Sequence, residues 1–341
     1  MNGPACPRPR RKTGIGVACL ALGLGFSLGA AMLHYWPAIL SVLPGADSLS
    51  LSGDMVGGTD DLDRRARVVD TVDDGVDPDA TVLLADTPAP LVVSLHSWSA
   101  DWRQHDPLLT ALADRGWNYI HPDFRGASNR PEACLSDQVI SDLDAAIAWM
   151  LAHGRVDRNR IFLIGTSGGG YTALGYRAKS RFPIRHTFAW VPITDLESWY
   201  YQSRAREAHY ADDILGCIGG QDDRDEQVDH AAMRARSPLF WPDNGNGAVT
   251  LYAGIDDGYT GSVPISHSID YFNRLAEPEQ RLTTDETTAL LTRTLREPEG
   301  SLAGRKVYLD RSSGDIRLVV FDGGHEMLGD AALEALLDNG R

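Results

Sequence analysis

The chain has 341 residues, of which 43% are hydrophobic and 23% charged, so its composition excludes a disordered tail and a coiled coil. Its formal net charge is −15. Residues 46–341 hold 28 of the 32 basic and all 47 acidic residues, a net charge of −19. This argues against general binding to nucleic acid, because neutralisation of phosphates supplies most of that affinity.

The first 45 residues read as a membrane signal. A basic cluster at residues 8–12 precedes 21 uncharged residues at 13–33, a length that suits a bilayer span. The basic flank predicts a cytoplasmic N-terminus with the rest of the chain outside. The run exceeds the hydrophobic region of a cleaved signal peptide, so we favour an uncleaved anchor in the inner membrane. A cleaved leader, giving a secreted or periplasmic protein, is the alternative.

The rest of the chain divides into a linker and one large domain. Residues 46–80 are rich in Gly, Asp, Ser and Pro and show little apolar periodicity, which is typical of a linker that leads into first strands. Residues 81–341 then form the domain. Cys134 and Cys217 are the two cysteines beyond the leader. A disulfide between them suits an exported chain, and two buried free thiols are the alternative.

Within this domain, short apolar runs typical of buried parallel strands alternate with segments of helical periodicity. The expected strands are residues 91–97, 119–124, 161–166, 186–192, 249–254 and 316–324. The expected helices are residues 107–116, 136–151 with Ser136 as N-cap, 168–178 and 265–275. Alternation of this kind predicts an α/β fold, with a mainly parallel sheet and helices on both faces. Residues 195–240 break the alternation, and we interpret them as an insertion that caps the carboxyl edge of the sheet.

One motif points to chemistry. Residues 165–169 read Gly-Thr-Ser-Gly-Gly, which fits G-x-S-x-G, and they lie between an expected strand and an expected helix. In that context the glycines allow a sharp turn that leaves the hydroxyl of Ser167 exposed at the strand end. The motif therefore predicts a nucleophilic serine.

A serine nucleophile needs a base, and the base needs an orienting carboxylate. His325 follows the last expected strand, where the base belongs in the chain order Ser, Asp, His. The acid is expected after the strand at 249–254, where Asp256 and Asp257 are adjacent. We favour Asp257 by its spacing from Gly254 and keep Asp256 open, with Asp195 as a third option.

The tetrahedral intermediate of such a reaction needs amide donors. One is expected from the backbone N–H of Gly168, directly after the serine, and the other from the loop after the first strand, at Ser97 or Trp98. His96 and Trp98 are therefore expected to line the site. None of the ten histidines stands in an H-E-x-x-H pattern or a close ligand cluster, so we predict no metal and no cofactor.

With these segments the sequence resembles α/β-hydrolases of the prolyl-oligopeptidase-like branch, and more closely exported bacterial carbohydrate esterases, including pectin methylesterase-like relatives. The resemblance spans roughly residues 80–330 and is carried by residues 95–102, 122–134, 165–170, 256–273 and 323–327. It implies an α/β-hydrolase fold and a metal-independent Ser–His–Asp ester hydrolase. The oxyanion loop departs from the H-G-G-G of many esterases, since it reads His96-Ser97-Trp98. The sequence shows no N-terminal β-propeller of the oligopeptidases, which favours an esterase.

The expected substrate is a small-molecule or polysaccharide ester, with acetyl or methyl esters on a carbohydrate favoured. Arg125 and Tyr259 are candidate substrate contacts, although Arg125 could instead hold the loop beside the site. The aromatic residues of the insertion could stack on sugar rings or simply pack: Trp199, Tyr200, Tyr201 and Trp241. A peptidase acting on short peptides is the alternative enzyme. A catalytically silent binding module is a third hypothesis, which the intact Ser–Asp–His order argues against.

Overall fold

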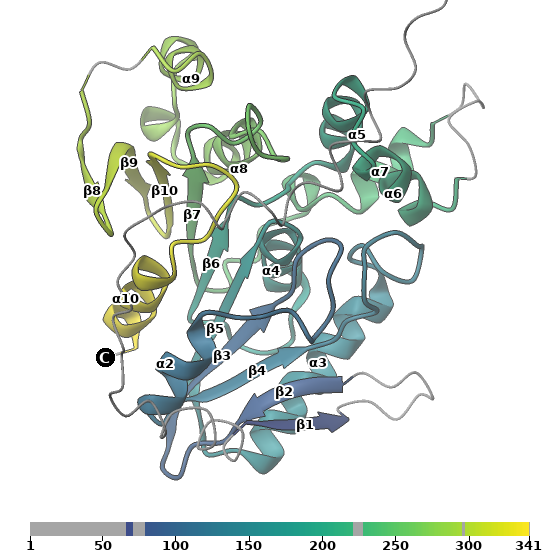
Figure 1. Cartoon of the computed structure of the whole chain (residues 1–341), viewed down its shortest axis with the longest axis vertical. Helices are drawn as coiled ribbons and strands as arrows, with labels where there is room; N and C mark the ends of the chain where they lie inside the picture. The colour runs from purple at the N-terminus through teal and green to yellow at the C-terminus, as the bar shows by residue number, and fades with distance from the viewer. Residues whose placement is uncertain (1–65, 71–78, 221–227, 295–296, 341) are drawn as a thin grey trace, which may run out of the picture. The chain divides into compact units, whose positions relative to one another are not determined.

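A computed structural model describes residues 66–70, 79–220, 228–294 and 297–340 (Figure 1). The predicted membrane signal at residues 1–45 and most of the linker lie outside the described residues. Among the helices of the described part, none is long and apolar enough to cross a bilayer.

The described strands form one mixed sheet in the order β1-β2-β4-β3-β5-β6-β7-β10-β9-β8. The six neighbouring strands from β4 to β10 are parallel, and the outer strands pair antiparallel on both sides. The strands are β1 (Arg67–Asp70), β2 (Asp79–Leu83), β3 (Ala89–Leu95), β4 (Asn118–Pro122), β5 (Val156–Thr166), β6 (His186–Trp190), β7 (Ala248–Gly254), β8 (Gly300–Leu302), β9 (Arg305–Ser313) and β10 (Ile316–Phe321). All six expected strands are present, and they make up the parallel centre of the sheet.

The helices of the described part are α2 (Leu108–Asp114), α3 (Asp137–His153), α4 (Gly168–Lys179), α5 (Leu196–Ala205), α6 (Tyr210–Cys217), α7 (His230–Ala235), α8 (Ser266–Leu275), α9 (Thr284–Leu291) and α10 (Gly329–Asn339), with short 3₁₀ turns at η2 (Pro238–Phe240) and η3 (Pro278–Gln280). The four expected helices are present as α2, α3, α4 and α8 and begin and end close to where periodicity predicts them, whereas the other helices of the described part were not predicted. Ser136 caps α3 as expected, because its side chain accepts a hydrogen bond from the backbone N–H of Val139.

The central strands are buried on both faces, which explains their uninterrupted apolar sequences. Val92 and Phe162 pack with α2 and α10 on one face. Val93 and Leu163 point to the opposite face, which α3 and α4 cover. Figure 1 shows this arrangement, with α2 and α10 together beside one face of the sheet. The chain therefore has the predicted α/β-hydrolase fold.

Between β6 and β7 the chain forms the helices α5, α6 and α7 and the turn η2. These elements, residues 196–240, are called the cap below. Three of the four aromatic residues considered for sugar stacking, Trp199, Tyr200 and Trp241, are buried in the same apolar cluster as α3 and α4. They pack the cap onto the domain, so they present no ring to a substrate.

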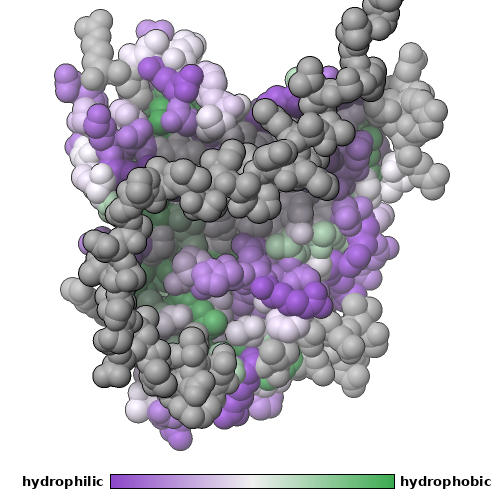
Figure 2. Space-filling view, viewed as in Figure 1, coloured by the Kyte–Doolittle hydropathy of each residue, from purple (hydrophilic) through white to green (hydrophobic). Residues whose placement is uncertain are grey.

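The expected disulfide is confirmed. Cys134 lies in the loop before α3 and Cys217 is the last residue of α6, and their sulfur atoms are bonded. The bond thus ties the cap to the main part of the domain. On the face seen in Figure 2, the surface over α9 is mostly hydrophilic. Tyr201 and Tyr259 are the exposed large hydrophobic residues of the described part.

Candidate active site

The register of the parallel strands brings four loops to one edge of the sheet. Leu95 at the end of β3 pairs with Gly165 near the end of β5. Gly254 at the end of β7 pairs with Phe321 at the end of β10. The segments after these strands carry the expected amide donors, the serine, the acid and the histidine. Residues that are up to 228 positions apart in sequence therefore meet at the carboxyl edge.

Ser167 occupies a sharp turn between β5 and α4. Its φ is 59° and its ψ is −118°, a backbone conformation that residues other than glycine rarely adopt. Its N–H donates to the carbonyl of Trp190 at the end of the neighbouring strand, which fixes the turn. The turn is tightly packed, since a Cβ on Gly165 would come within 2.3 Å of the backbone of Gly169. Backbone strain of this kind costs roughly 1–3 kcal/mol and is concentrated at functional sites.

The structure distinguishes Asp257 from the other candidate acids. Oδ2 of Asp257 accepts a hydrogen bond of 2.7 Å from Nδ1 of His325. Its other oxygen, Oδ1, accepts from the backbone N–H groups of Gly258 and Val263. The side chain of Asp257 is 1% exposed. A buried carboxylate with three donors is held in one orientation, and it can hold the imidazole in turn.

The other two candidate acids, Asp256 and Asp195, have different hydrogen-bond and ion-pair partners. Asp256 forms an ion pair of 2.8 Å with Arg293 at the surface. Asp195 caps α5, where its side chain accepts from the backbone N–H of Glu197 and from the hydroxyl of Ser198. Neither side chain is hydrogen-bonded to His325.

Two of the expected amide donors, Gly168 and Trp98, lie side by side. A Cβ placed on Gly168 would stand 2.3 Å from the backbone nitrogen of Trp98, so this position requires glycine. The N–H of Ser97 is already used, since it donates to Oε1 of Gln104 at 2.7 Å. Across the described residues, the backbone N–H groups of Trp98 and Gly168 have no hydrogen-bond acceptor in the protein. Trp98 rather than Ser97 is therefore the available donor.

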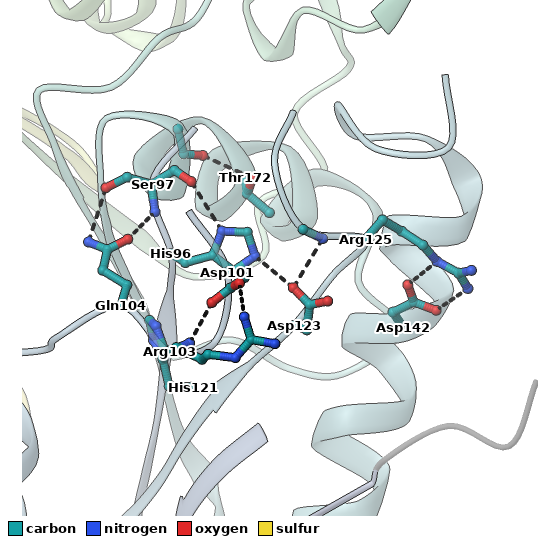
Figure 3. A network of polar contacts seen from close by, with 12 residues as sticks. His96, Ser97, Asp101, Arg103, Gln104, His121, Asp123, Arg125, Asp142 and Thr172 are labelled. Carbon is teal, nitrogen blue, oxygen red and sulfur yellow. Dashed lines mark hydrogen bonds and ion pairs between the residues drawn. The ribbon is translucent and has the colours of Figure 1, made fainter. Parts of the chain in front are cut away.

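His96 is 1% exposed and its ring lies between Ser97 and Asp123 (Figure 3), so it is not placed to touch a substrate. Its ring stacks on Phe124 with centroids 3.7 Å apart. Nδ1 donates to the carbonyl of Ser97 at 3.1 Å, and Nε2 lies 3.4 Å from Oδ1 of Asp123. Burial alone raises the pKa of Asp123, but its contact with His96 and two backbone donors bring that pKa below the ordinary value.

The bond from His96 orients the peptide unit that ends in the amide of Trp98. The carbonyl of Ser97 also accepts from the N–H of Ala100. In a trans peptide the C=O and the following N–H point in opposite directions. Fixing the carbonyl of Ser97 on the buried side therefore directs the N–H of Trp98 to the other side, where Gly168 lies.

A cavity of about 330 Å³ opens beside these groups. It is lined by Ser97, Trp98, Ser99, Ala100, Gln104, Thr166, Ser167, Tyr210 and His325. In the part of the chain that the structure describes, no hydrogen bond joins Ser167 to His325, and such bonds are often long before a substrate binds. Larger cavities of about 430, 390 and 450 Å³ lie elsewhere, and neither Ser167 nor His325 lines them.

Two further candidates do not reach the cavity. The guanidinium of Arg125 makes a two-pronged ion pair with Asp142 on α3, with distances of 2.6 and 2.7 Å (Figure 3). It holds the loop beside the site, which was one of its two predicted roles. The ring of Tyr259 stacks against Arg293, and its hydroxyl donates to the carbonyl of Leu291. The expectation that Tyr259 contacts a substrate is not supported by this placement.

Sequence reasoning missed three residues. Gln104 anchors the amide of Ser97, Tyr210 of α6 lines the cavity, and Asp213 of α6 accepts a hydrogen bond of 3.2 Å from the indole of Trp98. Burial raises the pKa of Asp213. No motif marks these residues, because they reach the site through the cap and a loop. Among the described residues, no group of three or more His, Cys, Asp or Glu could hold a metal ion.

Comparison with known families identifies the chain. The sequence model of the prolyl oligopeptidase family matches residues 103–294, more than half of the chain. The chain belongs to the prolyl oligopeptidase family. Membership places it among the serine hydrolases, as the turn at Ser167 predicts. The matched region contains Ser167 and Asp257 and ends before His325. A search of the curated proteins gave no match.

Solved structures agree with this family in fold. The acylaminoacyl peptidase of Pyrococcus horikoshii aligns with a TM-score of 0.52 and 16% identity, over 76% of this chain and 37% of that one. A puromycin-hydrolysing peptidase of Mycobacterium tuberculosis gives 0.53 and 17%, over 80% and 37%. An esterase of Pyrococcus furiosus gives 0.50 and 16%, over 82% and 88%. The chain thus spans 37% of the length of both peptidases. The closer relationship to carbohydrate esterases stays a prediction.

Proposed function

We propose that this chain hydrolyses carboxylic esters through an acyl-enzyme, with Ser167 as nucleophile, His325 as base and Asp257 as orienting acid. The observation that carries the proposal is the meeting of Ser167, His325 and the amide of Trp98 at one cavity. The buried bond between His325 and Asp257 supports the assigned roles, because it leaves Nε2 of His325 available to a proton from serine.

The proposed reaction has two halves. Ser167 attacks the ester carbonyl as its proton moves to Nε2 of His325, while the N–H groups of Trp98 and Gly168 stabilise the developing oxyanion. His325 then gives the proton to the departing alcohol, and Asp257 keeps the ring in the required tautomer. Water repeats these steps on the acyl-enzyme and releases the acid.

The cavity favours a small substrate. Its volume of about 330 Å³ is near the lower end of the range for small-molecule sites. The small side chains of Ser99 and Ala100 leave room for a short acyl group, and the hydrogen-bonded side chains of Gln104 and Ser97 give the cavity a polar wall for a hydroxylated alcohol. We therefore propose an acetyl or methyl ester on a carbohydrate as the substrate class. The buried cap aromatics do not contribute to this proposal.

A peptidase is the second candidate, and the match to the prolyl oligopeptidase family favours it. The same three catalytic groups cleave amides and esters, so kinetics must decide. The experiment compares kcat/KM for p-nitrophenyl acetate, an acetylated sugar, a methyl-esterified uronide and aminoacyl p-nitroanilides, with Ser167→Ala as the control. We expect turnover of the esters alone. Faster turnover of the anilides would replace the ester proposal with the peptidase.

We also propose that the domain works outside the cytoplasm, held by an uncleaved N-terminal anchor. The basic cluster at residues 8–12, the uncharged run at 13–33 and the disulfide of the domain support this, since disulfides persist in oxidising compartments. The full chain is expected in the membrane fraction, with its domain digested by protease added to spheroplasts. A protease-protected domain would contradict the proposal.

A further inference from the structure

Trp98, the residue whose amide we assign to the oxyanion, is held at two separate points. The Nε1 of its indole donates to Oδ2 of Asp213 on α6 across 3.2 Å. Its carbonyl accepts a hydrogen bond of 2.7 Å from the N–H of Ser128. The side chain is 2% exposed and meets Trp199 edge to face, with centroids 4.8 Å apart. Main chain and side chain are therefore both fixed.

Both anchors of Trp98 belong to one cross-linked unit. The disulfide joins Cys217 at the end of α6 to Cys134, in the same loop as Ser128. The Sγ of Cys217 lies 3.4 Å from the carbonyl of Ser128. A Cβ on Gly216 would come within 2.2 Å of the carbonyl of Asn129, so the helix rests directly on the loop. The loop and α6 are thus tied together around Trp98.

One face of α6 makes all the relevant contacts. Tyr210 lines the cavity, Asp213 holds the indole of Trp98, and Cys217 forms the disulfide. These residues stand at positions i, i+3 and i+7, which share a face of a helix. A carboxylate on that face is costly because it is partly withdrawn from water, so a specific partner is needed to keep it there. The carboxylate contacts the indole of Trp98 and the ring of His209, whose Nε2 lies 3.8 Å away.

We propose that Asp213 is a positioning residue for the oxyanion site, and that the Cys134–Cys217 disulfide holds the helix from which it acts. Asp213 touches neither the substrate nor the serine. It sets the place of the Trp98 side chain, and through it the direction of the Trp98 amide. The inference rests on the proposed function, because it takes that amide as an oxyanion donor.

The test uses matched substitutions on one helix. Asp213→Leu removes the acceptor while keeping the number and branching of side-chain heavy atoms, and Asp213→Asn keeps an acceptor. Asp212→Asn changes a neighbour that lines a separate cavity with Tyr200 and Arg204. With p-nitrophenyl acetate, we expect Asp213→Leu to lower kcat about 10- to 100-fold with KM within about 2-fold, because removal of a whole oxyanion donor costs about 10²–10³. Asp213→Asn restores kcat to within about 3-fold, and Asp212→Asn matches the wild type.

Two further variants keep the test decisive if Asp213→Leu does not fold. Trp98→Phe removes the indole N–H, and its loss of kcat should not add to that of Asp213→Leu in a double-mutant cycle. Cys134→Ala/Cys217→Ala should lower kcat in the same manner. Unchanged kcat in these variants, or a raised KM alone, overturns the inference. If the wild type turns over no more ester than Ser167→Ala, the proposed function fails; if the wild type is active and these variants keep its kcat, only the present inference fails.

Discussion

His325 and Asp257 share a hydrogen bond of 2.7 Å although 68 residues separate them in the chain. The parallel pairing of β7 with β10 accounts for this closeness, since Gly254 and Phe321 are partners and Asp257 and His325 follow them in the loops just after the two strands. Gly261 completes the fit, because a Cβ there would come within 2.2 Å of Oδ1 of Asp257 and 2.6 Å of Cβ of His325. The loop that follows Asp257 therefore packs closely against both side chains at Gly261.

Separate substitution of two adjacent aspartates tests the assignment of Asp257 as the catalytic acid. Asp257→Asn is expected to lower kcat for ester hydrolysis by roughly 10³- to 10⁴-fold, because the amide stabilises the wrong tautomer of His325 and no imidazolium. Asp256→Asn is the control, since Asp256 pairs with Arg293 at the surface, and its kcat should stay within about 3-fold of wild type. Equal losses in both variants would contradict the assignment.

His96 is expected to raise kcat for ester hydrolysis through its hydrogen bond to the carbonyl of Ser97. His96→Leu removes the donor and should lower kcat about 10- to 100-fold, with KM nearly unchanged. His96→Asn places a donor close to the position of Nδ1 and should recover most of that loss. Steady-state kinetics of both variants provide the measurement. A large rise in KM would instead indicate that His96 contacts the substrate.

Arg125 is expected to matter for stability and not for substrate binding. Its ion pair with Asp142 is nearly buried, with side chains 12% and 3% exposed, so Arg125→Met removes the two-pronged guanidinium partner of a buried carboxylate and should cost about 3–5 kcal/mol of unfolding free energy. Arg103→Met is the control, because its pair with Asp101 is exposed and should contribute less than about 1 kcal/mol. Denaturant unfolding gives both values. A raised KM in folded Arg125→Met would assign it to the substrate site.

Low pH should destabilise the domain because His267 becomes protonated. Its Nδ1 accepts from the N–H of Thr194 and its Nε2 donates to Gln202, so the ring is neutral. Burial lowers its pKa from 6.5 to about 4. The unfolded chain binds a proton on His267 more readily than the folded chain does. The contribution of the neutral His267 to the unfolding free energy is therefore complete above pH 6.5 and is lost as pH falls toward 4. His267→Asn keeps an acceptor, and its midpoint of urea unfolding should vary less between pH 7 and 4.5. An unchanged pH dependence would contradict this.

The parts of the site that sequence could predict are those with local signals. The turn at Ser167 is marked by the spacing of its glycines, and His325 by its place after the last apolar strand. Asp257 and Asp256 could be ranked but not separated, because the choice depends on which carboxylate faces inward. The structure separates them by burial and by the two backbone donors to Asp257.

What sequence could not predict depends on contacts between distant segments. Asp213 reaches Trp98 across 115 residues, from a helix in the insertion whose place no periodicity reveals. Trp98 and Ser97 look equivalent in sequence, and Gln104 decides between them by occupying the amide of Ser97. Tyr259 follows the acid closely in sequence, yet its ring turns toward Arg293.

The central claim is that Ser167 is an activated nucleophile, and labelling with a fluorophosphonate probe tests it most directly. The experiment uses the full chain in detergent, compares wild type with Ser167→Ala, and locates the adduct by mass spectrometry. The account predicts one adduct, on Ser167, which is absent from the variant and much slower to form in Asp257→Asn. A folded wild-type protein that acquires no adduct, or one that is labelled equally in Ser167→Ala, would contradict it.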